Sequence, residues 1–450
     1  MAKVAFVGFG EVNTPIDLII KKCTAAADAL ENEGLELIRV FPVTDDYEEK
    51  DIRKAVDALK GKDFDCLVVC IAGWIPTHAV VKVTEHFREK PMVLWGLCGW
   101  IEPDGRLVTT ADQAGTSAIR KTFYDLGYTF KFVYDIVGLP SNVKRVAQFT
   151  KAAEAAARLR HARVGMGGYR DMNLYGTQCD GPSLKRVVGP EVETFELLEL
   201  QQRYEKVTKE QKQAVIDNCM SKWKFLKPAK QESMEMAAGY YLAAKAICDE
   251  RGYEAISLKD VDGMKKLAGF PPAPIFMLLG DEEGLSTIPE NDALGNVTQL
   301  MVKFLTGQCA AYLEFYEFFE NSVIAGVPDY VPAEIIDGDV TVMPAAFGEL
   351  NEGILNVSRV KQGELTMFRL TVLDGQYCMH IQKGYGKTPS KWEEAGWTQP
   401  APQLPGLEVC LEDVPAFAEN VMCQHYIIAY GDQSSLMEDL CYILGIKIIK

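Results

Sequence analysis

Five continuous apolar segments, separated by amphipathic ones, set the strongest limit on how the first 160 residues can fold. The apolar segments are Val4–Gly10, Leu35–Val43, Cys66–Trp74, Met92–Leu97 and Phe130–Ile136. Strands that are apolar along their whole length are typical of a parallel sheet covered on both faces. The segments between them have helical periodicity, and two of them end at Gly61 and Gly127, as helices often do. This alternation predicts a doubly wound α/β domain over residues 1–161.

A second α/β unit is expected over residues 162–338. A strand leads into the glycine-containing loop of Ala162–Gly176, and helical segments follow at about 209–224 and at 231–251, the second closed by Gly252. Further strands are predicted at Ala255–Val261 and Ile275–Asp281. The alternation of strands and helices predicts a second doubly wound parallel sheet.

Beyond residue 338 the apolar pattern changes to the period of a strand. Apolar and polar residues alternate on both sides of Asp374-Gly375, a pair typical of a tight hairpin turn. A strand beginning at His425 and a helix ending at Gly445 follow. The expected fold class is therefore α/β, with two doubly wound parallel-sheet domains followed by a smaller β-rich C-terminal domain over residues 339–450.

Composition disfavours several classes of partner. The net charge of -16 argues against nucleic acid and anionic membranes. No apolar run reaches the roughly 20 residues that span a bilayer, and the N-terminal segment lacks the long apolar region of a signal peptide. The 12 cysteines are scattered without a Cys-x-x-Cys pair, as expected of reduced thiols. We therefore expect a cytoplasmic protein.

A glycine pair after the first strand raises the question of a dinucleotide site. Gly8 and Gly10 form the start of a Gly-x-Gly-x-x-Gly fingerprint, but Asn13 stands where the third glycine belongs. No acidic residue is clearly placed at the end of the second strand. A plain strand-to-helix turn is favoured, and an oxidoreductase is disfavoured.

A better candidate for chemistry is a set of carboxylates around one predicted helix, over residues 294–304. Glu290 and Asp292 precede this helix, and Glu314 lies on the strand predicted after it. In an open α/β sheet such positions can bring two carboxylates to one edge, where oxygen ligands suit Mg²⁺ or Mn²⁺. Acidic residues also cap helices and occupy solvated loops, and spacing alone leaves that alternative open.

His425 is one of five histidines and begins a core-like strand with Ile427 and Ile428. A lone histidine in such a place is more often structural than a ligand. The strand pattern alone therefore assigns it no role.

Two segments together resemble the L-fucose/L-arabinose isomerase superfamily. The first, IPENDALGNVTQLMVKFLTGQ followed by YLEFYE, is similar to the family's metal-site segment, in which a Glu-x-Asp pattern precedes a helix and an acidic residue lies on the next strand. The second, QHYIIAYGDQSSLMEDLCYILGI, is similar to the family's C-terminal end, where a histidine precedes a Tyr-Gly-Asp turn and a closing helix. The resemblance covers residues 160–450 and is weaker in the first domain.

The resemblance implies a metal-dependent aldose–ketose isomerase whose site lies between the second and third domains. Glu290, Glu314 and His425 would be the metal ligands, with Mn²⁺, or another divalent cation such as Mg²⁺ or Co²⁺, as the cofactor. Glu314 would also be the catalytic acid/base, with Glu290 sharing that role. Gln424 would contact sugar hydroxyls, and Asp292 is expected to support the entrance of the helix.

The implied reaction moves a proton between C1 and C2 of a pentose, a hexose or a deoxy or modified sugar, through an enediolate. A divalent cation polarises the sugar carbonyl as a Lewis acid, and a carboxylate carries the proton. The alternative is a non-catalytic cytoplasmic sugar-binding homologue.

The resemblance also implies a homo-oligomer, because members of the family form trimers or hexamers in which a neighbour's first domain completes each site. Trp74, Trp95 and Trp100 lie at or after predicted strand ends in the first domain. Trp74 is the candidate to stack on the sugar. Ordinary core tryptophans are the alternative.

Overall fold

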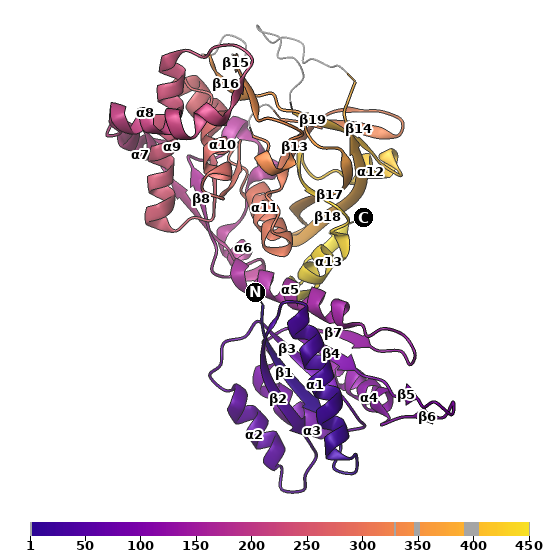
Figure 1. Ribbon diagram of the computed structural model, residues 1–450. Helices are drawn as coiled ribbons and strands as arrows, with labels where there is room; N and C mark the ends of the chain where they lie inside the picture. The colour runs from indigo at the N-terminus through magenta and orange to yellow at the C-terminus, as the bar shows by residue number, and fades with distance from the viewer. Residues whose placement is uncertain (1, 328–329, 346–351, 391–404, 450) are drawn as a thin grey trace. The chain divides into compact units, whose positions relative to one another are not determined.

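The computed structural model describes residues 2–327, 330–345, 352–390 and 405–449. The chain divides into two compact units, Met1–Ala157 and Arg158–Lys450 (Figure 1). The division falls inside helix α5 (Val143–Leu159). The expected domain boundary after residue 338 lies within the second unit and stays a prediction.

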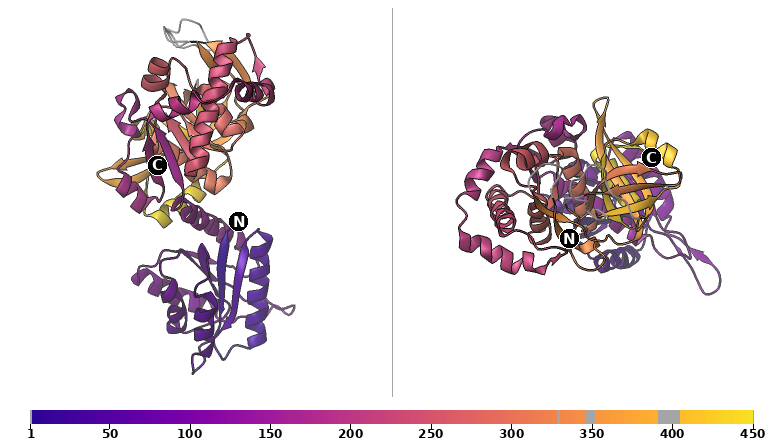
Figure 2. Two further views of the ribbon diagram at one scale, coloured as in Figure 1. Left: turned by 90° about the vertical axis from the view of Figure 1, so that its left-hand side faces the viewer. Right: turned by 90° about the horizontal axis from the view of Figure 1, so that it is seen from above.

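The first unit contains a parallel five-stranded sheet with helices on both faces (Figures 1 and 2). In the sheet order these strands are β2 (Glu36–Val43), β1 (Lys3–Phe9), β3 (Cys66–Ile71), β4 (Met92–Gly96) and β7 (Phe130–Tyr134). On one face Ala5 and Val7 share a core with Ile52 of α2 (Lys50–Leu59). On the other face Gly8 lies against α1 (Ile16–Asn32), so close that a Cβ on it would meet the Cys23 sulfur at 2.3 Å. The doubly wound fold expected here is confirmed.

The remaining elements of this unit connect those strands. The helices are α1 (Ile16–Asn32), α2 (Lys50–Leu59), α3 (Thr77–Thr84) and α4 (Asp112–Asp125). A short hairpin formed by β5 (Trp100–Ile101) and β6 (Leu107–Val108) follows β4.

The second unit begins with another parallel sheet, whose order is β12 (Ser286–Ile288), β11 (Ala255–Leu258), β8 (Arg163–Gly167) and β9 (Glu191–Phe195). Its helices are α6 (Gly181–Val187), α7 (Leu197–Tyr204), α8 (Lys209–Asn218), α9 (Gln231–Arg251), α10 (Ala273–Asp281) and α11 (Ala293–Thr306). Helix α9 ends at Gly252 in the left-handed conformation, as predicted. The second parallel sheet is likewise confirmed.

The strand expected at Ile275–Asp281 is wrong, because these residues belong to helix α10. Pro274 stands in its first turn, where proline costs no intrahelical hydrogen bond. Every residue from Ala273 to Gly280 is buried, since α10 packs against α9, β12 and β16 (Gly353–Asn356). A short apolar run has the same appearance in a buried strand and in a helix buried all round, so periodicity could not separate the two.

The β-rich part of the second unit is a seven-stranded sheet. In the sheet order its strands are β17 (Gly363–Leu373), β20 (His425–Tyr430), β13 (Ala311–Phe318), β14 (Ser322–Gly326), β19 (Gly406–Cys410), β18 (Gln376–Lys387) and β21 (Lys447–Ile449). An additional pairing of β17 with β18 closes the first six strands into a ring. Strands β13 and β14 precede residue 338, so this sheet draws on both sides of the expected boundary.

The predicted hairpin joins β17 to β18. Asp374 and Gly375 have φ of 50° and 77°, the left-handed pair that a tight two-residue turn requires. Smaller elements complete the unit: β10 (Lys224–Phe225), β15 (Thr341–Ala345), β16 (Gly353–Asn356), α12 (Val414–Asn420) and α13 (Ser434–Leu444). Among the helices of the described ranges, none has the length and apolar character needed to cross a bilayer.

Candidate metal centre

Glu314 and His425 face each other across two antiparallel strands of the seven-stranded sheet. Glu314 lies on β13 and pairs directly with His425, the first residue of β20. Residues opposite each other in an antiparallel pair project their side chains from the same face. The His425 Nε2 atom accordingly lies 3.8 Å from a Glu314 carboxylate oxygen.

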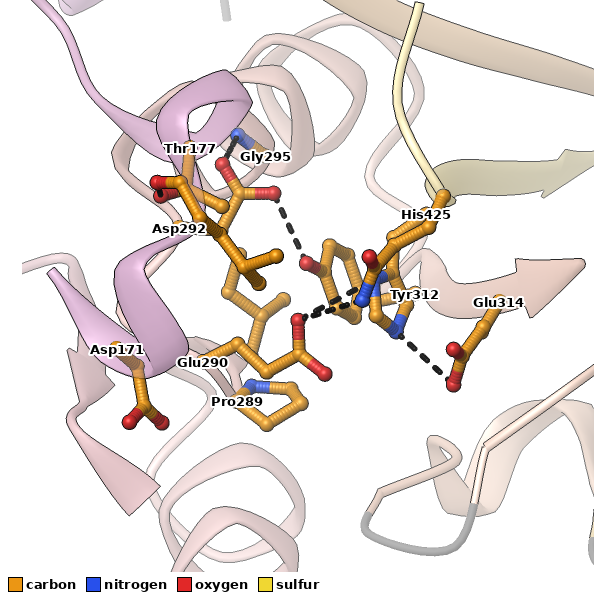
Figure 3. A network of polar contacts seen from close by, with 12 residues as sticks. Asp171, Thr177, Pro289, Glu290, Asp292, Gly295, Tyr312, Glu314 and His425 are labelled. Carbon is orange, nitrogen blue, oxygen red and sulfur yellow. Dashed lines mark hydrogen bonds and ion pairs between the residues drawn. The ribbon is translucent and has the colours of Figure 1, made fainter. Parts of the chain in front are cut away.

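Glu290 reaches the same place from the turn between β12 and α11. Its Oε2 atom lies 3.5 Å from His425 Nδ1 (Figure 3). One ligand atom each from Glu290, Glu314 and His425 lies within 4.8 Å of the other two. The structure thus brings together the three residues that the resemblance singled out, from three segments far apart in the chain.

The backbone that carries Glu290 is held in an uncommon conformation. Glu290 and Asn291 both have positive φ, 63° and 50°, which is rare for residues other than glycine. The Glu290 N–H donates to Asp260 Oδ1 at 2.6 Å. The Asn291 side-chain amide donates to the carbonyls of Gly168 and Tyr169. These contacts stabilise a turn that would otherwise relax, and so they keep the Glu290 carboxylate in place.

Gln424 acts on Glu290 directly. Its Nε2 donates to Glu290 Oε2 at 3.0 Å. Sequence reasoning expected Gln424 to contact sugar hydroxyls, and that role stays a prediction. The observed bond orients one carboxylate oxygen of Glu290, whose side chain is 12% exposed.

His425 is kept neutral and ready to act as a ligand. Its side chain is 1% exposed. Burial, and to a lesser extent the nearby Arg369 guanidinium, hold the pKa of His425 well below its usual value. Among the described residues its Nδ1 has no hydrogen-bond partner. A buried imidazole nitrogen without a partner is costly unless something else occupies its lone pair.

Asp292 does not join the cluster, and it supports the helix entrance as expected. Its carboxylate caps α11 by accepting from the Gly295 N–H at 2.8 Å. It also accepts from both terminal nitrogens of Arg369, whose side chain is as completely buried as that of Asp292. Sequence reasoning missed Arg369. The available signal was a charged residue inside the apolar segment Thr366–Val372, which on a strand indicates a buried charge with a buried partner.

The three side chains fit a divalent cation. Two carboxylates and one neutral imidazole suit Mn²⁺, Co²⁺ or Mg²⁺ with the remaining positions open to water or substrate. Two ligands at roughly 2.1 Å from one ion lie no more than about 4.2 Å apart. The observed limit of 4.8 Å therefore requires a closure of a few tenths of an ångström. Glu314, with its side chain 32% exposed, is the least constrained of the three.

The tryptophans differ in what they could contact. Trp74 follows β3 in the first unit and is 39% exposed, so its proposed stacking on a sugar stays a prediction. Trp95 is fully buried, and its indole N–H donates to Asp135 at 3.0 Å. It is an ordinary core tryptophan, which is one of the alternatives that the sequence left open.

Comparisons with known proteins leave the family of this chain open. No protein-family model matches it, and no curated protein matches its sequence. A periplasmic solute-binding protein of an ABC transporter from Actinobacillus succinogenes, solved with bound D-allose, is a solved structure that aligns with 68% of this chain and 93% of its own length. The sequence identity is 14% and the TM-score is 0.17. A likeness this weak supports no conclusion about fold or function.

Proposed function

We propose that the protein is a metal-dependent aldose–ketose isomerase. The observation that carries the proposal is the meeting of Glu290, Glu314 and His425 within 4.8 Å. These are the residues to which the resemblance to the L-fucose/L-arabinose isomerase superfamily assigns metal binding. A chance meeting of two carboxylates with a buried, neutral imidazole would leave that imidazole nitrogen unsatisfied, and a cation removes the cost.

The surroundings of the two carboxylates favour different roles. Glu290 is held at its backbone N–H and at one carboxylate oxygen, which suits a fixed metal ligand. Glu314 is more exposed and stands at the open side of the cluster, which suits an acid/base that must reach the sugar. His425 completes the donor set with a neutral nitrogen.

A bound Mn²⁺, or another divalent cation, supplies Lewis-acid polarisation of the sugar carbonyl. Glu314 then removes the proton from C2 of the aldose and returns it to C1, with the negative charge spread over an enediolate of the sugar, while the hydroxyl proton of O2 passes to O1 to complete the ketose. Glu290, whose carboxylate belongs to the same three-residue cluster, is the second candidate to carry the proton. The rigid turn around Glu290 keeps the site organised between turnovers.

The proposed substrates are pentoses, hexoses and their deoxy or modified forms. We also propose a cytoplasmic location, which fits a chain whose 12 cysteines are free thiols. A homo-oligomer, a trimer or a hexamer, is the proposed assembly. The first unit supports it with large apolar side chains left exposed at or after the ends of its strands: Trp74, Trp100, Ile101 and Leu107.

The first test measures Mn²⁺ binding by the metal-free protein. Millimolar Mn²⁺ should raise the melting temperature, because a ligand that binds only the folded state stabilises it. In crystals grown with Mn²⁺, a His425 nitrogen should lie roughly 2.0–2.3 Å from the ion. An unchanged melting temperature together with no ion at this place would overturn the proposal.

The second test screens aldoses for ketose formation in the presence of Mn²⁺. Conversion of one pentose or hexose, lost when a chelator removes the metal, is the expected outcome. Binding of metal and sugar without any conversion would instead identify a non-catalytic sugar-binding homologue.

A further inference from the structure

Tyr312 lies directly against the imidazole of His425. The two rings are nearly parallel, with an angle of 9° between their planes and 4.1 Å between their centroids. Tyr312 stands two residues before Glu314 on β13, so both side chains project from the same face of the sheet. The tyrosine is almost completely buried. Its ring therefore forms one wall of the candidate metal centre (Figure 3).

The hydroxyl of Tyr312 ties this ring to a buried ion pair. It donates to Asp292 Oδ2 at 2.9 Å. Asp292 is held in turn by Arg369, which also donates to the Gly176 carbonyl at 2.9 Å. The ring is thus fixed at its hydroxyl end by Asp292, the cap of α11, which is itself held by Arg369 of β17, and the face of the ring lies against His425.

Metal-binding histidines are usually oriented by a hydrogen bond from the ring nitrogen that does not bind the ion. The proposed cation occupies the lone pair of His425 Nδ1, which has no hydrogen-bond partner among the described residues, and Nε2 lies 3.8 Å from a Glu314 carboxylate oxygen, too far for a hydrogen bond with it. Some other contact must hold the plane of the imidazole. The parallel stack is the contact in the right place, because an aromatic face at this separation opposes rotation of the neighbouring ring.

We propose that Tyr312 is a positioning residue for the metal centre: its ring sets the plane of His425, and its hydroxyl anchors that ring to the Asp292–Arg369 pair. The inference rests on the proposed function, since it concerns the affinity of the same three ligands for a divalent cation. It assigns Tyr312 no contact with the sugar or with the reacting atoms.

The test compares Mn²⁺ affinity in three variants, measured from the electron paramagnetic resonance signal of the free ion. Tyr312→Leu removes the stack and should weaken binding by about 10- to 100-fold, the range typical of residues that orient metal ligands. Tyr312→Phe keeps the ring and loses only the anchor, so it should weaken binding less than Tyr312→Leu does, while its affinity stays below that of Tyr330→Phe. Tyr330→Phe is the matched control, because Tyr330 is also a buried tyrosine and its hydroxyl also donates to an aspartate, Asp281, at 3.1 Å.

Thermal unfolding of the metal-free variants separates positioning from stability. The expected result is that Tyr330→Phe loses stability but keeps its Mn²⁺ affinity, whereas both Tyr312 variants lose affinity. Equal affinity in Tyr312→Leu and the unchanged protein would overturn the inference alone. If Tyr312→Leu does not fold, Tyr312→Phe decides: an affinity no lower than that of Tyr330→Phe overturns it. Absence of Mn²⁺ binding in the unchanged protein would overturn the proposed function itself.

Discussion

At the scale of the residue, a substitution of Glu314 can test its proposed acid/base role with little effect on packing. Its side chain is partly exposed at the middle of β13, so replacing its carboxylate with an amide changes little that is buried. We expect Glu314→Gln to lower kcat by about 10²- to 10⁴-fold, the usual contribution of a general acid/base. Its melting temperature without metal should stay close to that of the unchanged protein. Steady-state kinetics on the sugar found active provide the measurement.

Glu317→Gln is the matched control for that variant. Glu317 lies on the same strand and is exposed, outside the three-residue cluster. It should keep the kcat of the unchanged protein. Full activity in Glu314→Gln would remove Glu314 from the proton relay.

His380 determines part of the response of this protein to acid. It is fully buried, and its Nδ1 lies 2.6 Å from the Tyr426 hydroxyl. Burial lowers the pKa of His380 to about 4. An unfolded chain protonates this histidine near pH 6.5, so between these values the unfolded state binds more protons. Stability is therefore lost as the pH falls from about 6.5 to about 4, by up to about 3 kcal/mol.

We expect His380→Asn to flatten this acid dependence. The asparagine oxygen can accept from Tyr426 in place of Nδ1, and it does not titrate. Urea unfolding at a series of pH values from 7 to 4 measures the slope. The buried His425 adds a dependence of the same sign, which the variant should retain. An unchanged profile would show that His380 gains its proton in the folded protein as easily as in the unfolded chain.

At the scale of the element, the entrance of α11 combines a helix cap with a buried ion pair. Asp292→Ala removes both, because it leaves Arg369 buried without its partner carboxylate. We expect a loss of about 3–5 kcal/mol, the cost typical of a broken buried pair. Asp413→Ala is the control, since Asp413 caps α12 in the same way but is exposed. It should cost only about 1 kcal/mol. Urea unfolding compares the two, and equal losses would contradict the importance of the buried pair.

Elements with a local signature could be predicted from sequence, and others could not. The hairpin at Asp374-Gly375 was predictable because two consecutive left-handed residues favour this pair. Helix α11 was predictable because its apolar residues recur at helical spacing and Gly307 ends it. Helix α10 was mistaken for a strand because its burial on all sides depends on α9, β12 and β16, which no local pattern reports.

At the scale of the whole molecule, the exposed apolar hairpin of the first unit tests the proposed assembly. Ile101 on β5 is more than half exposed in a single chain. If copies of the chain associate through this surface, Ile101→Lys should shift the particle mass in solution scattering from an oligomer towards a monomer. Leu373→Lys, at the similarly exposed hairpin of the second unit, is the control and should leave the mass unchanged. A monomer in the unchanged protein would remove the proposal of an oligomer.

The sequence by itself determined the two parallel sheets and the β17–β18 hairpin, because the spacing of apolar residues and the conformational preference of a turn are local properties. The resemblance of two segments to the L-fucose/L-arabinose isomerase superfamily singled out Glu290, Glu314 and His425 as candidate metal ligands. Only the tertiary structure decided that they meet, since the pairing of β13 with β20 sets His425 opposite Glu314. It also decided that Tyr312 lies on His425 and that Arg369 is buried against Asp292. Such contacts join segments distant in the chain, and their energy depends on burial that arises only when the whole unit has folded.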